Sequence, residues 1–388
     1  MSSGILRTGD NTRYMKKIFM FVNVDWFFLS HRLPVAEAAK KNNIDMSVFA
    51  ELTRTHSKKK INGFKFLESP LTRSSKSIFH FILEFFKTYK IIRRGQPSLI
   101  HAVTIKPILV LGIIARLTST PFIGSISGLG PAFSSDTFLK RLRLRFIVKV
   151  LRFIFHRKEI CLICQNTSDC DVLVGHNVLA IKKIFIIRGS GVDLDDFSPS
   201  KKTINSQKYI LMSSRILLDK GIQEYCMAAE IVAQSTNNKI KFKLSGPIDS
   251  SSPTSISRSK LEKMVAKYGV EYLGERVDMP ELLASATLFV LPSYYPEGLP
   301  KVLLEAAASG IPIITTDHPG CRDAIKNKET GLLVPPKDPE SLSNAIMELL
   351  SNDTVSKHMG EKARLLAEKS FQISSVVDDH YSIYQRLL

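Results

Sequence analysis

The sequence predicts an α/β protein built from two Rossmann-like domains, each with a doubly wound parallel sheet. Three observations carry this prediction. Short apolar strands alternate with helical stretches along most of the chain, which is typical of parallel sheets covered by helices. The alternation is interrupted near 197–206, where the sequence is polar and loses its periodicity, and then it resumes. A length of 388 residues is enough for two domains with sizeable cores.

The first domain is expected at 15–196, after a polar extension at 1–14 that lacks the apolar region of a secretory signal. In the helix predicted at 33–41, Pro34 stands near the start, where a missing N–H costs nothing. We expect strands at 17–23, 44–49, 99–103, 121–126 and 160–164, and further helices at 77–93 and 108–117.

The second domain is expected at 207–370 and repeats the alternation of strands and helices. A final helical stretch, 371–388, follows it. The strands of this domain are predicted at 209–213, 241–245, 270–272, 288–291 and 313–315.

The net charge of +18 is distributed unevenly along the chain. Residues 1–195 contain 31 Lys and Arg against 13 Asp and Glu, whereas the remainder contains 23 of each. All of the excess positive charge therefore belongs to the first half, which indicates that this half faces an anionic partner. A nucleic acid would be one such partner, but the sequence contains no recognisable nucleic-acid-binding module, so we expect none.

Composition also bears on the location of the protein. The nearest candidate for a spanning segment, 105–117, is interrupted by Lys106 and ends around Arg116, so no transmembrane helix is expected. Five cysteines form no disulfide pattern, which fits a reducing cytosol. Cys161 and Cys164 form one CxxC without a second pair at zinc spacing, so we expect a buried strand there and no metal site.

The most informative motif contains two glutamates eight positions apart. Glu297 lies in a loop rich in Pro and Gly after the strand at 288–291, and Glu305 lies about one turn into the next helix, whose first turn suits Pro300. Exposed N–H groups at a helix start form an anion site. An anion site flanked by carboxylates suits a ligand with both phosphates and hydroxyls, such as a nucleotide sugar. In isolation, the two acids would be solvated surface groups.

A cationic motif follows the first strand of the second domain. Arg215 and Lys220 come directly after 209–213, and Gly221 lets a helix begin close to a ligand. Parallel sheets bind their ligands at such turns. Arg offers phosphate oxygens a planar fork and Lys offers them a point charge, so the pair can stabilise a diphosphate leaving group. As isolated residues they would be ordinary surface charges.

These motifs resemble the signature of the retaining glycosyltransferases of family four (glycosyl transferases group 1), which have the GT-B fold. The resemblance runs from about residue 15 to the C-terminus and includes a hinge-like segment, 188–193, in which Ser190 departs from the common pattern. It implies two Rossmann-like domains facing across a cleft, with the C-terminal helix crossing back to the first domain. It also implies a retaining transfer that needs neither a metal nor a cofactor.

The same resemblance implies roles at the donor site. Glu305 would hold the ribose hydroxyls, and Glu297 would meet hydroxyls of the donor sugar. Arg215 and Lys220 would bind the diphosphate in place of a metal ion. Backbone groups would complete this site, at Gly298 and Leu299 beside the donor and at Val277 beside the base.

Three further positions have two interpretations each. Gly246 lies in a turn after a strand, which either lines the cleft or is a plain turn. His101 resembles the family histidine that faces the donor sugar, although the second histidine of many members is replaced here by Val103; the alternative is a structural role at a strand end. Lys106 could support an acceptor phosphate or be a surface lysine.

A Gly-rich stretch at 125–131 resembles a loop in the bacterial members that build surface polysaccharides such as O-antigen and capsule. Its Ser127 and Gly128 are therefore expected at the substrate site. The stretch is not a dinucleotide fingerprint, because the third glycine of that motif is not in place.

The opening loop, 23–34, resembles the same bacterial subset and lacks the glycine pair of many other members. This departure predicts an unusual acceptor contact. The roles of Asp25 and His31 stay open, and a packed Trp26 and a helix cap at Ser30 are equally good interpretations.

The segment 139–158 contains eight Lys and Arg and no Asp or Glu, together with many large apolar residues. On a helix, Arg141, Arg145 and Lys149 gather on one side. Such a basic amphipathic helix can lie in an anionic membrane interface, where each charge contributes roughly 1 kcal/mol. The alternative is a domain helix with a solvated basic face and a buried apolar face.

Together these features predict a peripheral glycosyltransferase on the cytoplasmic face of the inner membrane. It would move a hexose or N-acetylhexosamine from a nucleoside diphosphate sugar, UDP-linked by analogy with the family, to a polyprenyl-diphosphate-linked glycan. A GT-B enzyme that acts on a soluble acceptor or epimerises a nucleotide sugar is the alternative. A catalytically inactive scaffold is disfavoured because both glutamates and both cations are present.

Overall fold

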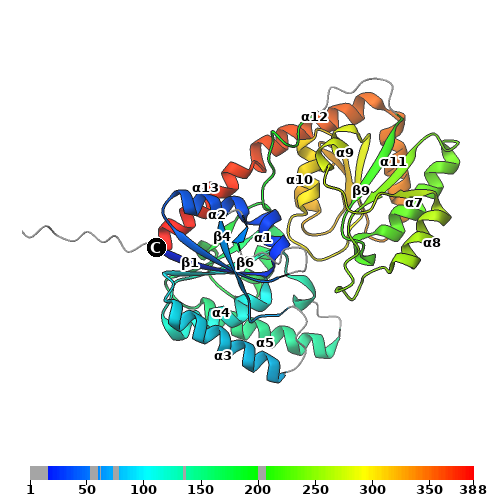
Figure 1. Ribbon diagram of the computed structural model, residues 1–388. Coiled ribbons are helices and arrows are strands. Elements are labelled where there is room, and N and C mark those ends of the chain that lie inside the picture. The colour runs from blue at the N-terminus through cyan, green and yellow to red at the C-terminus, as the bar shows by residue number, and fades with distance from the viewer. Residues whose placement is uncertain (1–15, 53–59, 62, 73–77, 134–136, 200–206) are drawn as a thin grey trace, which may run out of the picture.

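The computed structural model describes residues 16–52, 60–61, 63–72, 78–133, 137–199 and 207–388. The predicted N-terminal extension and most of the predicted interdomain stretch lie outside these ranges. Two α/β domains stand side by side, and the last helices run from the second domain back onto the first (Figure 1). The predicted fold class is confirmed.

The first domain contains an eight-stranded sheet in the order β3-β4-β2-β1-β5-β6-β7-β8. All neighbouring strands are parallel except β3 and β4. The central β5, β6 and β7 are buried at every position, as expected for strands covered by helices on both faces. The strands are β1 (Lys17–Val24), β2 (Asp45–Glu51), β3 (Lys60–Ile61), β4 (Phe64–Glu68), β5 (Leu99–Val103), β6 (Phe122–Ile126), β7 (Ile160–Cys164) and β8 (Ile184–Ile186).

Helices cover both faces of this sheet. One layer contains α3, α4 and α5, which pack in that order, and α1 and α2 lie on the other face (Figure 1). The helices are α1 (Asp25–His31), α2 (Leu33–Lys41), α3 (Ile78–Gly95), α4 (Ile105–Thr118), α5 (Phe138–Phe155) and α6 (Thr167–Gly175). The short α1 occupies the stretch that we predicted as an opening loop.

The second domain contains a six-stranded parallel sheet in the order β11-β10-β9-β12-β13-β14. Its strands are β9 (Tyr209–Ser213), β10 (Lys241–Ser245), β11 (Val270–Tyr272), β12 (Leu288–Leu291), β13 (Ile313–Thr316) and β14 (Gly331–Val334). Its helices are α7 (Ile222–Ser235), α8 (Arg258–Tyr268), α9 (Met279–Ser285), α10 (Lys301–Ala308), α11 (Pro339–Ser351) and α12 (Asp353–Ser370). One hydrophobic core joins both faces.

Each sheet has a topological switch point where the strand order reverses. In the first sheet this point lies between β1 and β5, and in the second it lies between β9 and β12. Ligands of open parallel sheets bind in the crevice at the carboxyl ends of such strands. The two switch points therefore define where a shared ligand site is expected.

The C-terminal helix α13 (Ile373–Leu387) crosses back to the first domain, as the resemblance implied. It packs against α2, and its Val376, Ile383 and Tyr384 belong to the hydrophobic core of the first domain. A β-bridge between Val192 and Gln372 fixes the start of the crossing. Within the described ranges, no helix combines the length and apolar character needed to cross a bilayer.

Candidate active site

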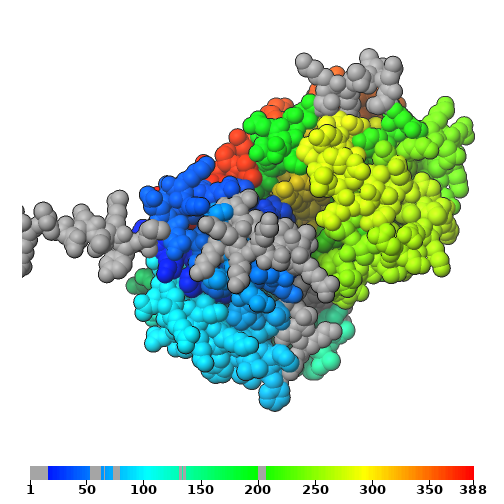
Figure 2. Space-filling view, in the orientation of Figure 1, coloured from blue at the N-terminus to red at the C-terminus, as the bar shows by residue number. Residues whose placement is uncertain are grey.

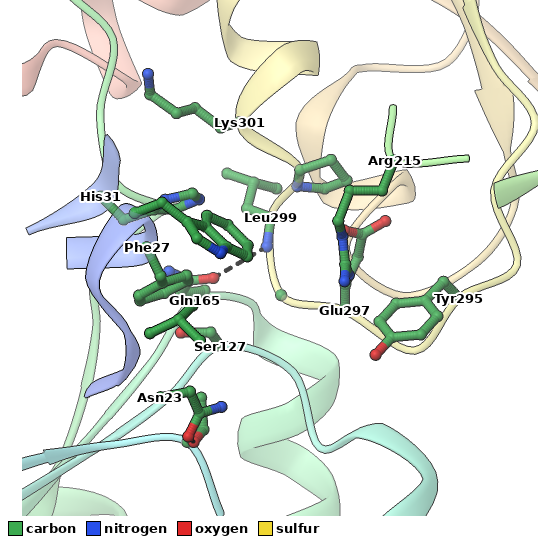
Figure 3. Close-up of a pocket in the computed structure, with 15 residues that line it drawn as sticks. Asn23, Phe27, His31, Ser127, Gln165, Arg215, Tyr295, Glu297, Leu299 and Lys301 are labelled. Atoms are coloured by element: carbon green, nitrogen blue, oxygen red, sulfur yellow. Dashed lines mark hydrogen bonds between the residues drawn. The ribbon is translucent and has the colours of Figure 1, made fainter. Parts of the chain in front are cut away.

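A pocket of about 240 Å³ lies where the two switch points face each other. The surface is hollowed at the junction between the N-terminal and C-terminal domains (Figure 2). Residues from the first domain form one wall and residues from the second form the other (Figure 3). The lining residues are Asn23, Val24, Trp26, Phe27, His31, Thr104, Ser127, Gln165, Arg215, Tyr295, Glu297, Gly298, Leu299, Pro300 and Lys301.

Glu297 and Lys220 meet at the C-terminal wall. Lys220 lies in the short 3-10 turn after β9, and its ammonium group forms an ion pair with the Glu297 carboxylate. Both side chains are largely buried, and Ser293 donates a second hydrogen bond to Glu297 at 3.2 Å. The structure thus brings together two residues that the sequence motifs placed in the same site.

Arg215 lies beside this pair and lines the pocket. Its guanidinium donates to the Asp249 carboxylate at 2.7 Å and stands over the Tyr295 ring at 5.9 Å. Each cation of the predicted clamp is therefore held by a carboxylate, and a bound diphosphate would compete with these carboxylates for the cations.

Glu305 lies in the second turn of α10 and pairs with Lys301 at 2.9 Å. Lys301 lines the pocket, whereas Glu305 is not among the described residues that line it. Pro300 takes the cap position just before α10, with a ψ of 119°, rather than a place in the first helical turn as predicted. Its extended backbone turns the chain into the helix.

The two walls touch through backbone groups. Gly298 donates its N–H to the Ser127 carbonyl oxygen at 3.0 Å, and Leu299 donates to the Gln165 side chain at 3.3 Å (Figure 3). Gly128 has a φ of +104°, and a Cβ there would lie 2.6 Å from Glu297. A glycine is thus required where the Gly-rich loop meets the glutamate loop.

The N-terminal wall is formed by residues at the carboxyl ends of strands. Asn23 lies near the end of β1 and Thr104 follows β5, and the Thr104 hydroxyl donates to the side-chain amide oxygen of Asn23 at 2.9 Å. Ser127 follows β6, and its hydroxyl is buried without a hydrogen-bond partner among the described residues. Of these, only Ser127 was predicted. Their position at the carboxyl ends of β1 and β5, beside the switch point, is the signal that could have identified the other two.

Aromatic side chains extend this wall. Trp26 and Phe27 on α1 line the pocket, and Trp26 is 37% exposed. Phe27 stacks on the His31 ring with 4.3 Å between the ring centroids. Within the opening loop, Trp26 and His31 both line the pocket, whereas Asp25 is fully buried.

His101 does not reach this pocket. The ring is fully buried, and its two nitrogens lie 2.8 Å from the Tyr384 hydroxyl and 2.7 Å from the Ser125 hydroxyl. These contacts favour the alternative, a structural role, which His101 would play from the middle of β5; a contact with the donor sugar stays a prediction. The helix α13, which supplies Tyr384, covers the ring.

Lys106 likewise makes its contacts outside the pocket. It forms an ion pair with Glu84 on α3 at 2.8 Å and donates to the Thr72 carbonyl oxygen at 2.6 Å. It is not among the described residues that line the pocket. These contacts connect α4 with α3, and a role at an acceptor phosphate stays a prediction.

Gly246 and Val277 lie outside the pocket lining. At Gly246 a Cβ would lie 1.8 Å from the Ser214 carbonyl oxygen, so this glycine lets the turn after β10 pass close to the turn that carries Arg215. Val277 is 98% exposed in the loop before α9. A role in base binding stays a prediction for Val277, because its backbone is open to a ligand.

A buried polar cluster lies below the N-terminal wall. Arg32 is 1% exposed, and its guanidinium donates to the His31 carbonyl oxygen at 3.1 Å. Burial, together with the nearby positive charge of Arg32, lowers the pKa of His31 and of His380 to about 3. Burial, followed by the neighbouring His380 and Arg32, lowers the pKa of His101. All three rings are therefore neutral at physiological pH.

A second surface of interest lies on α3 and α5. Exposed basic residues on α5 include Arg141, Arg145 and Lys149, and the predicted 139–158 segment is a helix from Phe138 to Phe155. Both helices also expose large apolar side chains, namely Phe79, Ile82, Leu83, Phe86, Phe138, Leu139, Leu142, Phe146 and Phe153. A surface that mixes exposed rings with cations is unusual for a face in contact with water alone.

Two family models match the chain. Residues 17–166 match the model described as glycosyl transferase 4-like, and residues 195–366 match the model described as glycosyl transferases group 1.

Curated relatives match most of the chain. It is 28% identical over 382 residues to N,N'-diacetylbacillosaminyl-diphospho-undecaprenol alpha-1,3-N-acetylgalactosaminyltransferase of Campylobacter jejuni, covering 93% of this chain and 96% of that one. It is 27% identical over 310 residues to UDP-Gal:alpha-D-GlcNAc-diphosphoundecaprenol alpha-1,3-galactosyltransferase of Escherichia coli, covering 76% and 77% respectively.

Solved structures share the fold at lower identity. Sucrose-phosphate synthase from Thermosynechococcus elongatus superposes with a TM-score of 0.77 at 20% identity, over 96% of this chain and 99% of that one. Alr3699/HepE of Anabaena, in complex with UDP and glucose, superposes with a TM-score of 0.76 at 17% identity, over 96% and 100%. The two-domain arrangement is the GT-B fold.

Proposed function

Because the chain belongs to the glycosyltransferases of group 1, we propose that it moves a hexose or N-acetylhexosamine from a UDP-sugar to a polyprenyl-diphosphate-linked glycan. The observation that carries this proposal is the pocket between the switch points, where Arg215 and Glu297 on one wall face hydroxyl, amide and aromatic groups on the other. Such a pocket can hold a charged donor against a hydroxyl-rich acceptor.

The donor binds at the C-terminal wall. Its diphosphate takes the place of the carboxylates that hold Lys220 and Arg215 in the free protein. Glu297, released from Lys220, then accepts hydrogen bonds from the hydroxyls of the sugar, and Glu305 holds the ribose. The two cations stabilise the charge that develops on the leaving diphosphate, so this scheme requires no metal ion.

The transfer proceeds with retention on one face of the sugar. The bond between the anomeric carbon and the phosphate oxygen breaks, and the acceptor hydroxyl forms its new bond to the same carbon from the same side. The proton of that hydroxyl passes to the departing phosphate oxygen, and the nucleoside diphosphate leaves. His101 takes no part in these bond changes, because its ring is buried under α13.

The acceptor assignment follows the relatives. The names of the Campylobacter jejuni and Escherichia coli enzymes specify undecaprenyl-diphosphate-linked acceptors. A lipid-linked acceptor requires access to a membrane surface, here the cytoplasmic face of the inner membrane. The exposed cations of α5 and the exposed apolar residues of α3 and α5 suit peripheral contact with anionic lipid.

The experiment that tests this function measures release of nucleoside diphosphate from a panel of UDP- and GDP-sugars, with and without polyprenyl-diphosphate-linked sugars. Release that requires one donor together with the lipid acceptor is expected. Slow hydrolysis at the same rate with and without the lipid-linked sugar would contradict a lipid-linked acceptor and favour a soluble one. Conversion of the nucleotide sugar without release of the diphosphate would indicate an epimerase.

A further inference from the structure

The N-terminal wall contains groups that the donor scheme above does not use. Trp26 and Phe27 present aromatic surface to the pocket. Ser127 lines the pocket, and its hydroxyl is buried and lacks a hydrogen-bond partner among the described residues. An unpaired buried hydroxyl costs free energy unless a ligand or water completes it. The Ser127 hydroxyl can therefore bond to a group outside the described residues.

The backbone at Thr104 also favours a ligand at this wall. Its φ of 75° is rare for a β-branched residue, and strain of this kind concentrates at ligand sites. Thr104 stands at the N-cap of α4, yet its hydroxyl donates to Asn23 instead of accepting a bond from the helix. The strained backbone thus serves to hold the Asn23 amide at the pocket, in an orientation that leaves the NH₂ group able to donate.

We propose that Trp26, Asn23 and Ser127 form the subsite for the terminal sugar ring of the acceptor. The apolar face of the ring lies on the indole, and the ring hydroxyls bond to the Asn23 NH₂ group and the Ser127 hydroxyl. An aromatic surface beside a few convergent polar groups matches a pyranose, which has apolar C–H faces and a polar rim. This inference rests on the proposed function and specifies its acceptor side.

The location of the subsite separates acceptor from donor. The cations and carboxylates that suit a nucleotide lie on the opposite wall, with Arg215 and Glu297 across the pocket from Asn23 and Ser127 (Figure 3). An acceptor must approach the anomeric carbon from within this space. The N-terminal wall therefore faces the acceptor sugar. Hydrogen bonds between this wall and the hydroxyls of the sugar would help to select which sugar binds.

The chain contains one tryptophan, so its fluorescence reports on this subsite alone. The probes are a short-chain polyprenyl-diphosphate-linked N-acetylglucosamine, the bare polyprenyl diphosphate and UDP. We expect a saturable change of Trp26 emission with the sugar-bearing lipid and little change with the other two. An equal response to the bare lipid would overturn the sugar assignment, as would a response to UDP alone or no response to any probe.

Kinetics of Trp26→Ala and Trp26→Phe provide the second test. Loss of the stacking surface is expected to raise the KM for the acceptor about tenfold, and the phenylalanine variant should recover most of it. Donor binding measured by calorimetry should be unchanged, and thermal unfolding of both variants controls for folding. A weakened donor with an unchanged acceptor KM would refute the subsite.

These outcomes separate the inference from the function on which it rests. If the wild-type protein transfers sugar to lipid and Trp26→Ala leaves the acceptor KM unaltered, only the subsite is wrong. If the wild-type protein transfers nothing to any lipid-linked sugar, the proposed function fails. The subsite is then judged separately, and it is overturned if the sugar-bearing lipid does not change the Trp26 emission.

Discussion

The two walls of the pocket use different chemistry. At the C-terminal wall, each cation of the clamp is paired with a carboxylate, Lys220 with Glu297 and Arg215 with Asp249. At the N-terminal wall, neutral hydroxyl and amide groups stand beside exposed aromatic surface at Trp26. Part of the excess charge of the N-terminal half is instead exposed on α5, where none of the basic residues belongs to the described pocket lining.

This difference shows how one pocket can handle two unlike substrates. Because each cation is paired with a carboxylate, the donor site is close to neutral. A diphosphate that binds there replaces these carboxylates as the partner of the two cations. Neutral polar groups suit a glycan, which carries hydroxyls and little charge. The basic surface on α5 remains available for the lipid or its membrane.

The largest expected effect comes from removing the clamp at the C-terminal wall. Lys220→Ala should lower transfer by about 10²–10³-fold, because charge on the leaving diphosphate is no longer stabilised. Glu305→Ala is expected to abolish transfer as well, through the loss of the ribose contact. The measurement is kcat/KM with the donor and acceptor identified by the release assay.

Lys208→Ala is the matched control for this prediction. Lys208 also pairs with an acid, Asp353 at 2.8 Å, but both side chains are exposed, and exposed pairs contribute little. Circular dichroism and thermal unfolding should show that all three variants fold. Near wild-type turnover in Lys220→Ala would contradict a cationic clamp for the diphosphate at the C-terminal wall, and with it the proposed difference between the two walls.

The second largest effect concerns the basic surface of the first domain. Replacing Arg141, Arg145 and Lys149 together by Gln should weaken binding to anionic vesicles by about 100-fold at low salt, since each charge contributes roughly 1 kcal/mol. Vesicle sedimentation measures this binding. A charge-matched change on the second domain, the joint replacement of Lys260, Lys263 and Lys267 on α8 by Gln, should leave it unchanged. Equal losses in the two variants would show that net charge, and not α5, drives the binding.

The fold was largely predictable because its strands are short, apolar and separated by helices. The predicted bounds of β5, β9, β10, β11 and β12 agree with the structure. Strands β3, β4, β8 and β14 were not predicted. β3 and β4 contain charged residues, and β3, β8 and β14 are only two to four residues long, so none has the longer apolar run that identifies a buried strand.

The candidate site was predictable in part. Residues Glu297 and Lys220 come together as the motifs implied, because their spacing follows strands that meet at one sheet edge. The pattern placed His101 beside the donor, but its ring does not line the described pocket, and no sequence pattern shows that Tyr384, 283 positions away, contacts this ring. Asn23 and Thr104 were missed because each becomes informative only when β1 and β5 are known to be neighbours.

A third prediction tests the contact between the two walls. Gly128→Ala places a Cβ 2.6 Å from Glu297 at a φ of +104°, so the Gly-rich loop must move away from the glutamate loop. We expect kcat/KM to fall roughly tenfold, in line with the usual cost of overpacking. Gly175→Ala, at a position with nothing within 4 Å, is the control that should leave activity intact. If both variants are fully active, the contact does not shape the pocket.

The smallest effect concerns the buried cluster beneath the N-terminal wall. His380 has a pKa lowered to about 3, whereas in the unfolded chain it takes up a proton below about pH 6.5. Because only the unfolded chain protonates His380 in this range, the free energy of unfolding falls by about 1.4 kcal/mol per pH unit as pH falls from about 6.5 towards about 3. Above that range the contribution of His380 is constant.

His380→Leu removes this proton uptake together with a buried ring nitrogen that has no partner among the described residues. The variant should unfold with a shallower pH dependence than wild type, while His31 and His101 keep part of the slope. Urea titrations at pH 7.5 and pH 5, followed by Trp26 emission, measure the difference. Parallel pH dependences in the two proteins would contradict a neutral, buried His380.

The crossing of α13 also sets an order of events during synthesis. The Tyr384 hydroxyl meets the His101 ring across 283 positions of chain, so the first domain is made long before its last core residues exist. The end of β8 at Ile186 and Tyr384 are 198 positions apart, so at about 5–20 residues per second the last helix follows the completed sheet by roughly 10–40 s. Until then the core positions of Val376, Ile383 and Tyr384 are unfilled on the nascent chain. The domain made first is thus the last to be completed, and its maturation awaits the final turns of the polypeptide.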